Sequence, residues 1–454
     1  MTTSMRSIPN RRSRFALDIA LEIKRRGTLD FFESTWHRYG DLAQLQIASQ
    51  VIFLVVHPDH VRRVTVEKDD TYTKRASYDS VRKLLLGDGL VASTGALWRR
   101  QRKLMAPFFT PRAAETYLPI IVEDGAWFRE RWNAAALRGE PLDMLTEMSV
   151  LTASIILKSM FSMEAAGTID WVRGAVETMI GFVSSRQMNP LHAPLWLPTP
   201  RNRAYLDARA RVHAYIQDVI RQRRAQPPES WPNDLLSRLM QARDDETGEP
   251  MADSLLRDES ITIFFAGHET TARTLAFLWY ALAGHPEVAA RMHAEIDAVL
   301  GDDAPTVAHL KQLPYTLQVI KETLRLYPAA PMYVRDAVAP DEIDGTHIPV
   351  GAQMLVMPYL THRHPDFWPD PPRFDPDRWQ PEEEAARHRY AYHPFAAGQR
   401  VCIGNNFSLF ESHLLVAMLA RHFVLRRVPG HTPQVWTNGT LGSRNGLPML
   451  VGRR

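Results

Sequence analysis

The sequence contains one cysteine, Cys402, in 454 residues. An internal disulfide is therefore impossible, and the cysteine count gives no sign of an oxidising compartment. An excess of one charge is also missing, because 54 Lys and Arg residues balance 51 Asp and Glu residues to a net charge of +3. Such a balance does not favour nucleic acid as a partner.

Long apolar runs are absent as well. No run approaches the ~18 residues that a membrane-spanning helix needs. The longest are Ile261–Gly267 and Leu414–Ala420. The basic start of the chain, Met1–Arg14, is not followed by the apolar stretch of a signal peptide. We therefore expect a cytoplasmic protein without a transmembrane anchor. We interpret the basic start as a solvated tail, with peripheral membrane contact as the alternative.

Linkers, internal repeats and low-complexity tracts are not found either. The proline-rich stretches are too short to separate two independent domains. With 45% hydrophobic residues, the chain can bury a large core. We expect an N-terminal segment over residues 1–30 and a single domain over residues 31–454.

Helical periodicity dominates the patterns that are present. Helices are expected at residues 98–109, 151–161, 204–225, 254–284, 286–300, 313–327 and 405–422. Strands are expected at residues 42–47, 51–56, 352–358 and 447–451, with a hairpin turn around residues 48–50. The expected fold class is mainly α, with small antiparallel β-sheets near the two chain ends.

The sequence around Cys402 favours a functional thiolate, although a lone cysteine more often packs in a core. It lies just before an expected helix, whose free N–H groups and dipole stabilise a thiolate. Gly398 and Gly404 remove side-chain bulk, so the backbone can approach the sulfur and a flat macrocycle. Phe395 can shield the thiolate, and Arg400 can pair with a carboxylate-bearing cofactor edge.

The segment from Phe395 to Gly404 resembles the haem-binding signature of the cytochrome P-450 family, Phe-x-x-Gly-x-Arg-x-Cys-x-Gly, at every fixed position. The resemblance spans nearly the whole chain in the family's motif order. It implies the cytochrome P-450 fold, haem b (iron protoporphyrin IX) as cofactor and Cys402 as the iron ligand. It also implies a monooxygenase that uses dioxygen to hydroxylate a lipophilic small molecule.

The expected helix over residues 254–284 carries a second motif. A glycine in mid-helix costs about 1 kcal/mol relative to alanine. Gly267 therefore needs a reason, such as close approach of a ligand or, alternatively, helix packing. Glu269 and Thr270 offer an acid and a hydroxyl for passing protons, and the Thr270 hydroxyl is expected to bond a carbonyl one turn back and open the helix. The segment resembles the family's Ala/Gly-Gly-x-Asp/Glu-Thr motif, which implies that this pair delivers protons during dioxygen reduction and that Gly267 lies at the cofactor.

A third motif is Glu322-Thr-Leu-Arg325, whose charged residues face the same side of a helix. Such pairs are common and usually form exposed bridges worth less than about 1 kcal/mol. Here the pair and the later Arg378 resemble the family's Glu-x-x-Arg helix and its partner arginine. The resemblance implies a buried charge network of Glu322, Arg325 and Arg378 that holds the cysteine loop. Trp379 replaces the commoner phenylalanine.

Haem propionates require basic and indole donors. Trp98 and Arg102 stand four residues apart on one helical face and resemble the family's Trp-x-x-x-Arg propionate pair. Arg335 falls where the family often supplies a third donor, with a surface strand residue as the alternative. Arg400 is the expected fourth donor. Substrate-pocket walls are expected, against ordinary core packing, from Tyr78, Leu90, Phe182, Ile263, Phe264, Ala266, Ala330, Met332 and Leu441.

The motifs around Glu322–Pro328 and His362–Pro365 look similar to the fatty-acid and xenobiotic branch of the family. They imply lipophilic substrates such as fatty acids, terpenoids or polycyclics. The residues that follow Cys402 are too few for a reductase, so we expect a separate electron donor, a ferredoxin or a flavodoxin with its reductase. We also expect a monomer.

Two other functions stay open: a haem-thiolate protein that binds or senses small ligands without turnover, and a peroxide-driven oxygenase. The intact pair of Glu269 and Thr270 argues against the sensor, because a sensor needs no proton relay.

Overall fold

A computed structural model of the chain describes residues 10–12, 16–47, 50–163, 167–188, 192–243, 248–301 and 305–454. Contacts between residues divide the chain into two units, each built from segments far apart in sequence. The first unit comprises Met1–Asp79, Leu324–Cys402 and Val435–Ser443, and the second comprises Ser80–Thr323, Ile403–Gln434 and Arg444–Arg454. The expectation of a single domain over residues 31–454 stays a prediction.

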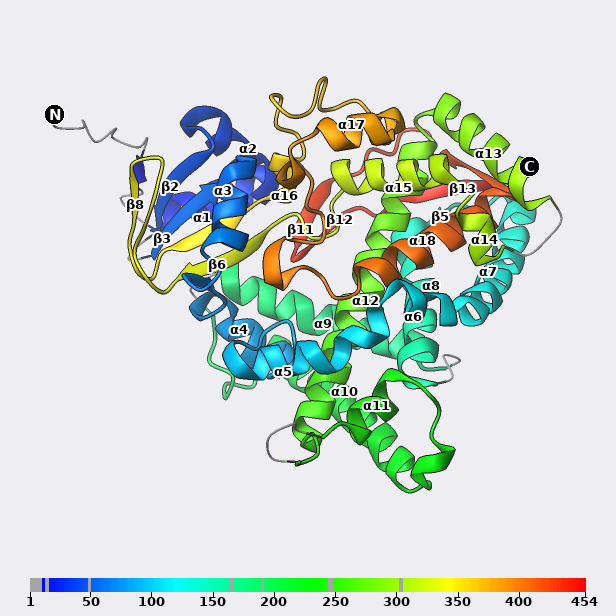
Figure 1. The fold of residues 1–454 in the computed structure, drawn as a ribbon, viewed down its shortest axis with the longest axis horizontal. Coiled ribbons are helices and arrows are strands. Elements are labelled where there is room, and N and C mark those ends of the chain that lie inside the picture. Colours follow the sequence, from blue (N-terminus) through cyan, green and yellow to red (C-terminus); the bar gives the residue numbers. More distant parts are fainter. Residues whose placement is uncertain are drawn as a thin grey trace. The chain divides into compact units, whose positions relative to one another are not determined.

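The first unit is built on a six-stranded sheet with the order β1-β2-β3-β9-β6-β4 (Figure 1). Its strands are β1 (Asn10–Arg12), β2 (Leu42–Ile47), β3 (Gln50–Val55), β9 (Gln353–Val356), β6 (Tyr333–Ala337) and β4 (Tyr72–Thr73). The pair β2–β3 is the predicted antiparallel hairpin, with turn residues 48 and 49 outside the described part. Two pairs, β1–β2 and β3–β9, are parallel, so this largest sheet is mixed.

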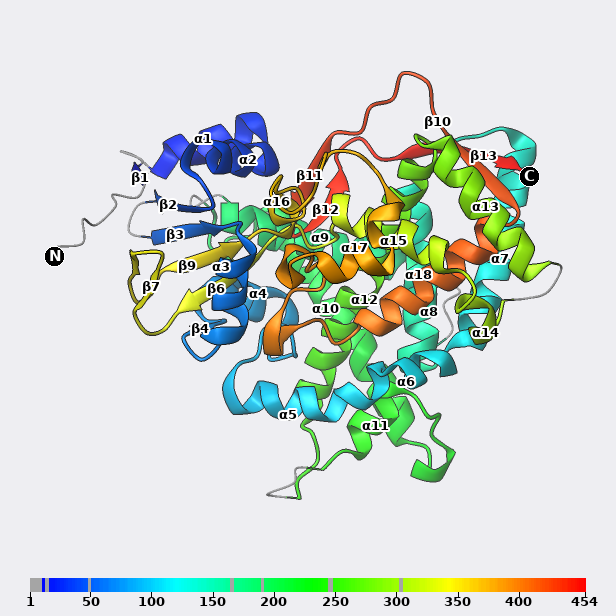
Figure 2. The same cartoon turned by 45° about the horizontal axis from the view of Figure 1, so that its top comes forward.

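Strand alternation puts one face of this sheet into a core. Phe53 and Val55 of β3 and Met354 and Val356 of β9 are buried in the same cluster. Figure 2 shows helices next to the edge of the sheet that β1 and β2 form. The other elements of the unit are α1 (Ala16–Arg26), α2 (Thr28–Tyr39), α3 (Pro58–Arg62), α16 (Pro358–Thr361), α17 (Pro381–Ala386), the hairpin β7 (Asp341–Ile343) and β8 (Thr346–Ile348), and the hairpin β11 (Val435–Asn438) and β12 (Thr440–Ser443).

The second unit is mainly helical and is organised around α12 (Asp253–Leu282), which packs along α8 (Met144–Phe161) (Figure 1). Its other helices are α5 (Gly95–Met105), α6 (Pro111–Thr116), α7 (Leu118–Arg138), α9 (Ile169–Met188), α10 (Pro200–Arg224), α11 (Leu235–Gln241), α13 (Pro286–Leu300), α14 (Val307–Leu310), α15 (Pro314–Leu326, whose last residues belong to the first unit) and α18 (Asn405–Ala420). The division of the chain after Asp79 falls within the short α4 (Asp79–Val81). An antiparallel sheet joins β10 (Phe423–Arg427), β13 (Pro448–Arg453) and β5 (Leu142–Asp143).

Local chemistry sets several boundaries. The Thr199 hydroxyl accepts the Asn202 N–H at 3.1 Å and Pro200 occupies the first turn, so α10 begins there. The predicted bounds of β2 and α13 are confirmed residue by residue. One helix of the described part, α8, is long and apolar enough to cross a membrane, but 78% of its apolar stretch Met144–Phe161 is buried inside the protein. It is therefore a core helix of the second unit.

Candidate active site

The cysteine loop belongs to the first unit. Cys402 is exposed, and its N–H donates to the Phe395 carbonyl at 2.9 Å. The loop makes a single 3₁₀ turn over Gly398–Arg400, and α18 begins directly after Gly404. The thiol is thus reachable and stands just before a helix N-terminus, as a thiolate ligand requires.

Gly398 fixes the position of this loop. Its φ of +72° is left-handed, and a Cβ there would lie 1.7 Å from the Thr65 carbonyl oxygen. Backbone cannot move aside as a side chain can, so only glycine fits. Packing of the loop on the helical turn at Arg63–Glu67 therefore explains why residue 398 is a glycine. The predicted close approach of Gly398 to the macrocycle stays a prediction.

Cations gather beside the loop within the first unit. The antiparallel register of β4 and β6 pairs Tyr72 with Ala337 and Thr73 with Asp336, which brings Lys74 next to Arg335. Burial, together with the charges of Arg335 and Arg400, lowers the pKa of Lys74 well below its usual value, and Cys402 opposes this shift. The Lys74 ammonium lies 4.5 Å from the centre of the Tyr78 ring.

Cations gathered in this way suit an anionic ligand. A dianionic cofactor edge such as the two haem propionates would be such a ligand, so the group fits haem. Arg335 is buried, which excludes the alternative of a surface strand residue. Lys74 was missed by the sequence analysis, because only the pairing of β4 with β6 brings it to the site.

The second unit carries the other predicted donors and the acid–alcohol motif. Trp98 is buried and Arg102 is half-buried, four residues apart on α5 as expected. On α12, the Thr270 hydroxyl donates to the Ala266 carbonyl at 2.7 Å, which confirms the predicted bond. Arg273 donates to the Glu269 carboxylate at 3.1 Å.

The predicted opening of the helix at Thr270 is wrong, because α12 runs unbroken from Asp253 to Leu282. The neighbouring helix α8 supports this turn: the Thr152 hydroxyl donates to the His268 carbonyl at 2.7 Å. A Cβ on Gly267 would lie 2.5 Å from Cδ1 of Ile156. Close packing of α8 and α12 therefore explains the mid-helix glycine, and contact of Gly267 with the cofactor stays a prediction.

Glu322 and Arg325 are both fully buried, so they are no exposed bridge. The Arg325 guanidinium donates to the carbonyl oxygens of His362 at 3.0 Å, Pro371 at 2.8 Å and Arg373 at 2.8 Å. Arg378 donates to the carbonyl of Asp370, in the same segment, at 2.9 Å. Both arginines thus bind backbone of the segment 370–373, which precedes the cysteine loop in the chain. A three-membered network with Glu322 stays a prediction.

The predicted pocket residues divide between the two units. Tyr78, Ala330, Met332 and Leu441 lie in the first unit, where the fully buried Leu441 donates its N–H to the Ala329 carbonyl at 2.9 Å. Leu90, Phe182, Ile263, Phe264 and Ala266 lie in the second. Phe182 stacks on Tyr205 with 4.0 Å between ring centres, which is ordinary core packing. Ala266 is exposed although residues 261–265 of the same helix are buried.

Two carboxylates at the start of α12, which the sequence analysis missed, hold the turn that contains Leu90. Asp258 accepts the Asp88 N–H and Glu259 accepts the Leu90 N–H, each at 3.0 Å. A Cβ on Gly89 would lie 2.0 Å from the Thr262 hydroxyl oxygen. Burial raises the pKa of Glu259 to about 8, against the opposing hydrogen bond from Leu90. In the sequence, this contact could have been sought only from two features: the adjacent acids Asp258 and Glu259, and the distant turn that contains Gly89.

A cysteine loop that is fixed by backbone contact and has cations beside it is the arrangement expected of a haem-thiolate protein. The family model of the cytochrome P450s matches residues 14–447, and the chain belongs to this family. It is 37% identical to cyclooctat-9-en-7-ol 5-monooxygenase of Streptomyces melanosporofaciens, over 87% of this chain and 84% of the relative. It is 31% identical to pentalenene oxygenase of Streptomyces avermitilis, over 86% of this chain and 85% of that protein.

The crystal structure of the cytochrome P450DA haem domain has the same fold. The TM-score is 0.86 at 28% sequence identity, covering 96% of this chain and 95% of that one. The predicted fold class, haem b as cofactor and the monooxygenase activity are thereby confirmed.

Glu322→Ala should yield mostly haem-free or insoluble protein, because removing one member of a buried charged group strands the others. The ratio of haem to protein absorbance measures loading. Glu287→Ala, an exposed glutamate at the start of α13, is the matched control. Normal loading of the Glu322 variant would mean that the helix does not support the cysteine loop.

Glu259→Gln should change how stability depends on pH. The folded protein keeps the Glu259 proton up to about pH 8, while the unfolded chain loses it near the ordinary pKa of 4.5. Between these values the free energy of unfolding of the wild type falls as pH rises, by at most about 1.4 kcal/mol per pH unit from this group. The variant should lose this part of the pH dependence of the free energy of unfolding, as measured by denaturant unfolding between about pH 4.5 and pH 8. Equal slopes in both proteins would contradict it.

Proposed function

We propose that this cytochrome P450 monooxygenase hydroxylates a terpenoid, with Cys402 as the iron ligand and Glu269 with Thr270 as the proton-delivering pair. The observation that carries the proposal is the cysteine loop, which presents an exposed Cys402 before α18 and beside the cations Lys74, Arg335 and Arg400. When bound, haem supplies the activation of dioxygen.

In this proposal the protein's own residues hold and orient the haem and deliver protons. Cys402 would bind the iron, and the charges of Lys74, Arg335 and Arg400 would hold the propionates, with Trp98 and Arg102 as further donors. Phe395 shields the sulfur. Gly398 and Gly404, which lack side chains, let the backbone of the loop approach the sulfur and the macrocycle. The Thr270 hydroxyl moves protons that the Glu269 carboxyl takes up, and Arg273 keeps that carboxyl in place at 3.1 Å.

A terpenoid substrate is supported by the relatives, two of which are named cyclooctat-9-en-7-ol 5-monooxygenase and pentalenene oxygenase. The predicted wall residues are almost all apolar, which suits such a ligand. Fatty acids and polycyclics are the other members of the lipophilic class and are outcomes of a substrate screen, in which ligands shift the iron from low to high spin.

The electron donor we propose is a separate ferredoxin, or a flavodoxin with its reductase. The exposed Arg99 and Lys103 on α5 suit an acidic protein, and the sequence pI near 8.9 agrees. We also propose a cytoplasmic monomer.

The sensor and the peroxide-driven oxygenase make different demands. Reductant consumption without oxygenated product across a broad lipophilic library would favour the sensor. Efficient product formation from hydrogen peroxide without an electron donor would favour the peroxide-driven enzyme. The intact Glu269–Thr270 pair supports the dioxygen-dependent reaction over both.

The reduced holoprotein with carbon monoxide should show the red-shifted Soret band of thiolate-ligated haem. Cys402→His keeps a possible ligand of another type and should lose the red shift. An ordinary imidazole-type spectrum in the wild type would refute Cys402 as the ligand.

Thr270→Ala should keep haem and substrate binding but release reducing equivalents as peroxide, because the hydroxyl that moves the proton is gone. Product formed per reductant consumed, with peroxide release, is the measurement. Thr270→Ser retains the hydroxyl and should stay coupled. Full coupling in the alanine variant would falsify the role of Thr270.

A further inference from the structure

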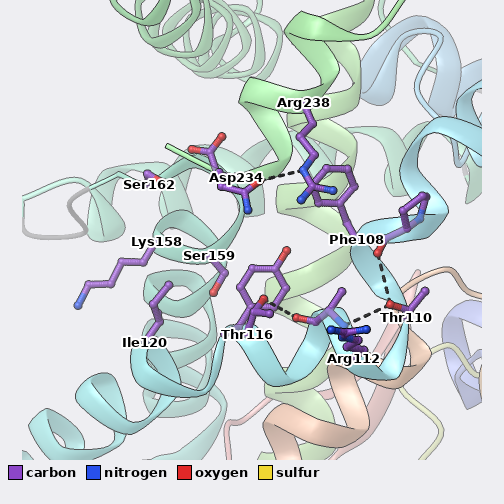
Figure 3. Close-up of a pocket in the computed structure, with 14 residues that line it drawn as sticks. Phe108, Thr110, Arg112, Thr116, Ile120, Lys158, Ser159, Ser162, Asp234 and Arg238 are labelled. Carbon is purple, nitrogen blue, oxygen red and sulfur yellow. Dashed lines mark hydrogen bonds between the residues drawn. The ribbon is translucent and has the colours of Figure 1, made fainter. Parts of the chain in front are cut away.

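The second unit contains a cavity of about 450 Å³ that the proposed oxygen chemistry does not use. It lies where the segment 107–120, the C-terminal end of α8 and the start of α11 meet, and Figure 3 shows its walls. Neither Glu269 nor Thr270 lines it, and none of the predicted cofactor-binding residues does. The volume is sufficient for a small organic molecule.

Ser159 of α8 brings a hydroxyl to the wall of this cavity. A serine within a helix can donate to the carbonyl one turn earlier. The Ser159 hydroxyl makes no such bond: the residue is 2% exposed, and its oxygen has no hydrogen-bond partner within the described part of the chain. A buried polar group in this state costs free energy, which a ligand that bonds to it would recover.

Asp234, the N-cap residue of α11, brings an acceptor to the same cavity. Its Oδ1 accepts the Arg223 guanidinium N–H at 2.9 Å and the Ser237 N–H at 2.8 Å, so the charge is already balanced. The residue is 2% exposed, and Oδ2 has no partner among the described residues. Oδ2 therefore needs a donor, and a neutral hydroxyl suits it better than a second cation.

Arg238, within α11, offers the opposite chemistry. Its Nε donates to the Asn233 side chain at 2.9 Å, and its guanidinium carbon lies 4.5 Å from the centre of the Phe108 ring. These two contacts fix the guanidinium, and no carboxylate of the described part pairs with it. A fixed guanidinium with available Nη groups suits the planar or trigonal oxygens of a carboxylate or a phosphate.

These charged groups act on one phenol of the cavity wall. Burial raises the pKa of Tyr117 to about 12, against the charge of Arg238 and together with that of Asp234. Both charges therefore lie near the Tyr117 hydroxyl. Figure 3 shows Arg238 and Asp234 on one side of the cavity and Ser159 on the neighbouring wall formed by α8. The cavity thus combines a receptor for an anion with partners for hydroxyl groups.

We propose that this cavity is a second ligand site, which binds a small hydroxylated anion such as a sugar phosphate or a sugar acid. Arg238 receives the anionic group, and Ser159 and Oδ2 of Asp234 bond to hydroxyl groups of the ligand. Binding is non-covalent and involves no electron transfer. The site is independent of the substrate at the haem, so the proposed oxygenase function can fail without affecting it.

Calorimetric titration of the wild-type holoprotein tests the site. The ligands are glucose 6-phosphate and gluconate, and the comparisons are inorganic phosphate, acetate and glucose, each of which carries only one half of the expected recognition. We expect at least one of the two hydroxylated anions to bind at least about tenfold more tightly than every comparison molecule. Failure of both to bind, or equal affinity for a comparison molecule, would overturn the proposal.

Variants assign the binding to this cavity. Arg238→Ala should weaken binding of the hydroxylated anion about tenfold or more, because a charge-assisted bond is lost. Ser159→Ala removes one neutral hydrogen bond and should weaken it about fivefold. Arg203→Ala, an exposed arginine of α10 outside the cavity, is the matched control and should bind as the wild type does. Unchanged affinity in either cavity variant, or equal weakening in the control, contradicts the proposal.

Thermal unfolding separates a binding role of Ser159 from a structural one. Because its hydroxyl has no partner in the described part, ligand-free Ser159→Ala should unfold at no lower temperature than the wild type. The hydroxylated anion should raise the unfolding temperature of the wild type more than that of the variant. A large loss of stability in the ligand-free variant would mean that the hydroxyl supports the fold, and would refute its assignment to a ligand.

Discussion

The contact of Gly398 with the Thr65 carbonyl determines where the cysteine loop can lie. A Cβ at this position would sit 1.7 Å from that oxygen, and backbone has no rotamer with which to yield. The 3₁₀ turn over Gly398–Arg400 and the bond from Cys402 to Phe395 extend this constraint to the sulfur. The proposed role of Cys402 as iron ligand gains from such rigidity, because small displacements of a ligating group are costly in function.

Each unit brings ionisable side chains of one kind close together: cations in the first unit and carboxyl groups in the second. In the first unit, Lys74, Arg335 and Arg400 are close enough to depress the pKa of the lysine, which a dianionic cofactor edge would relieve. In the second unit, burial and then the charge of Asp124 on α7 raise the pKa of Glu411 on α18 well above its usual value, which favours the protonated form of this glutamic acid. Buried charge is tolerated in proteins when a function or a partner accounts for it.

Sequence patterns predicted what depends on local chemistry. The bounds of β2 and α13 follow from periodicity and caps, and the burial of Glu322 and Arg325 agrees with what the family resemblance of their motif implies. Contacts between distant segments were not predictable. Lys74 reaches Arg335 only through the register of β4 with β6. Gly267 has a packing reason in Ile156 that no helical pattern reveals.

The two adjacent threonines of α12 cannot do the same work. Successive residues of an α-helix point about 100° apart. The Thr270 hydroxyl bonds back to Ala266, on the side of the helix where that alanine is exposed. The Thr271 hydroxyl instead lies beside Ser408 of α18 and the buried Glu411. An unbroken α12 therefore presents one hydroxyl to its exposed side and the next to a buried acid, so only Thr270 of the two suits the proposed proton-delivering role.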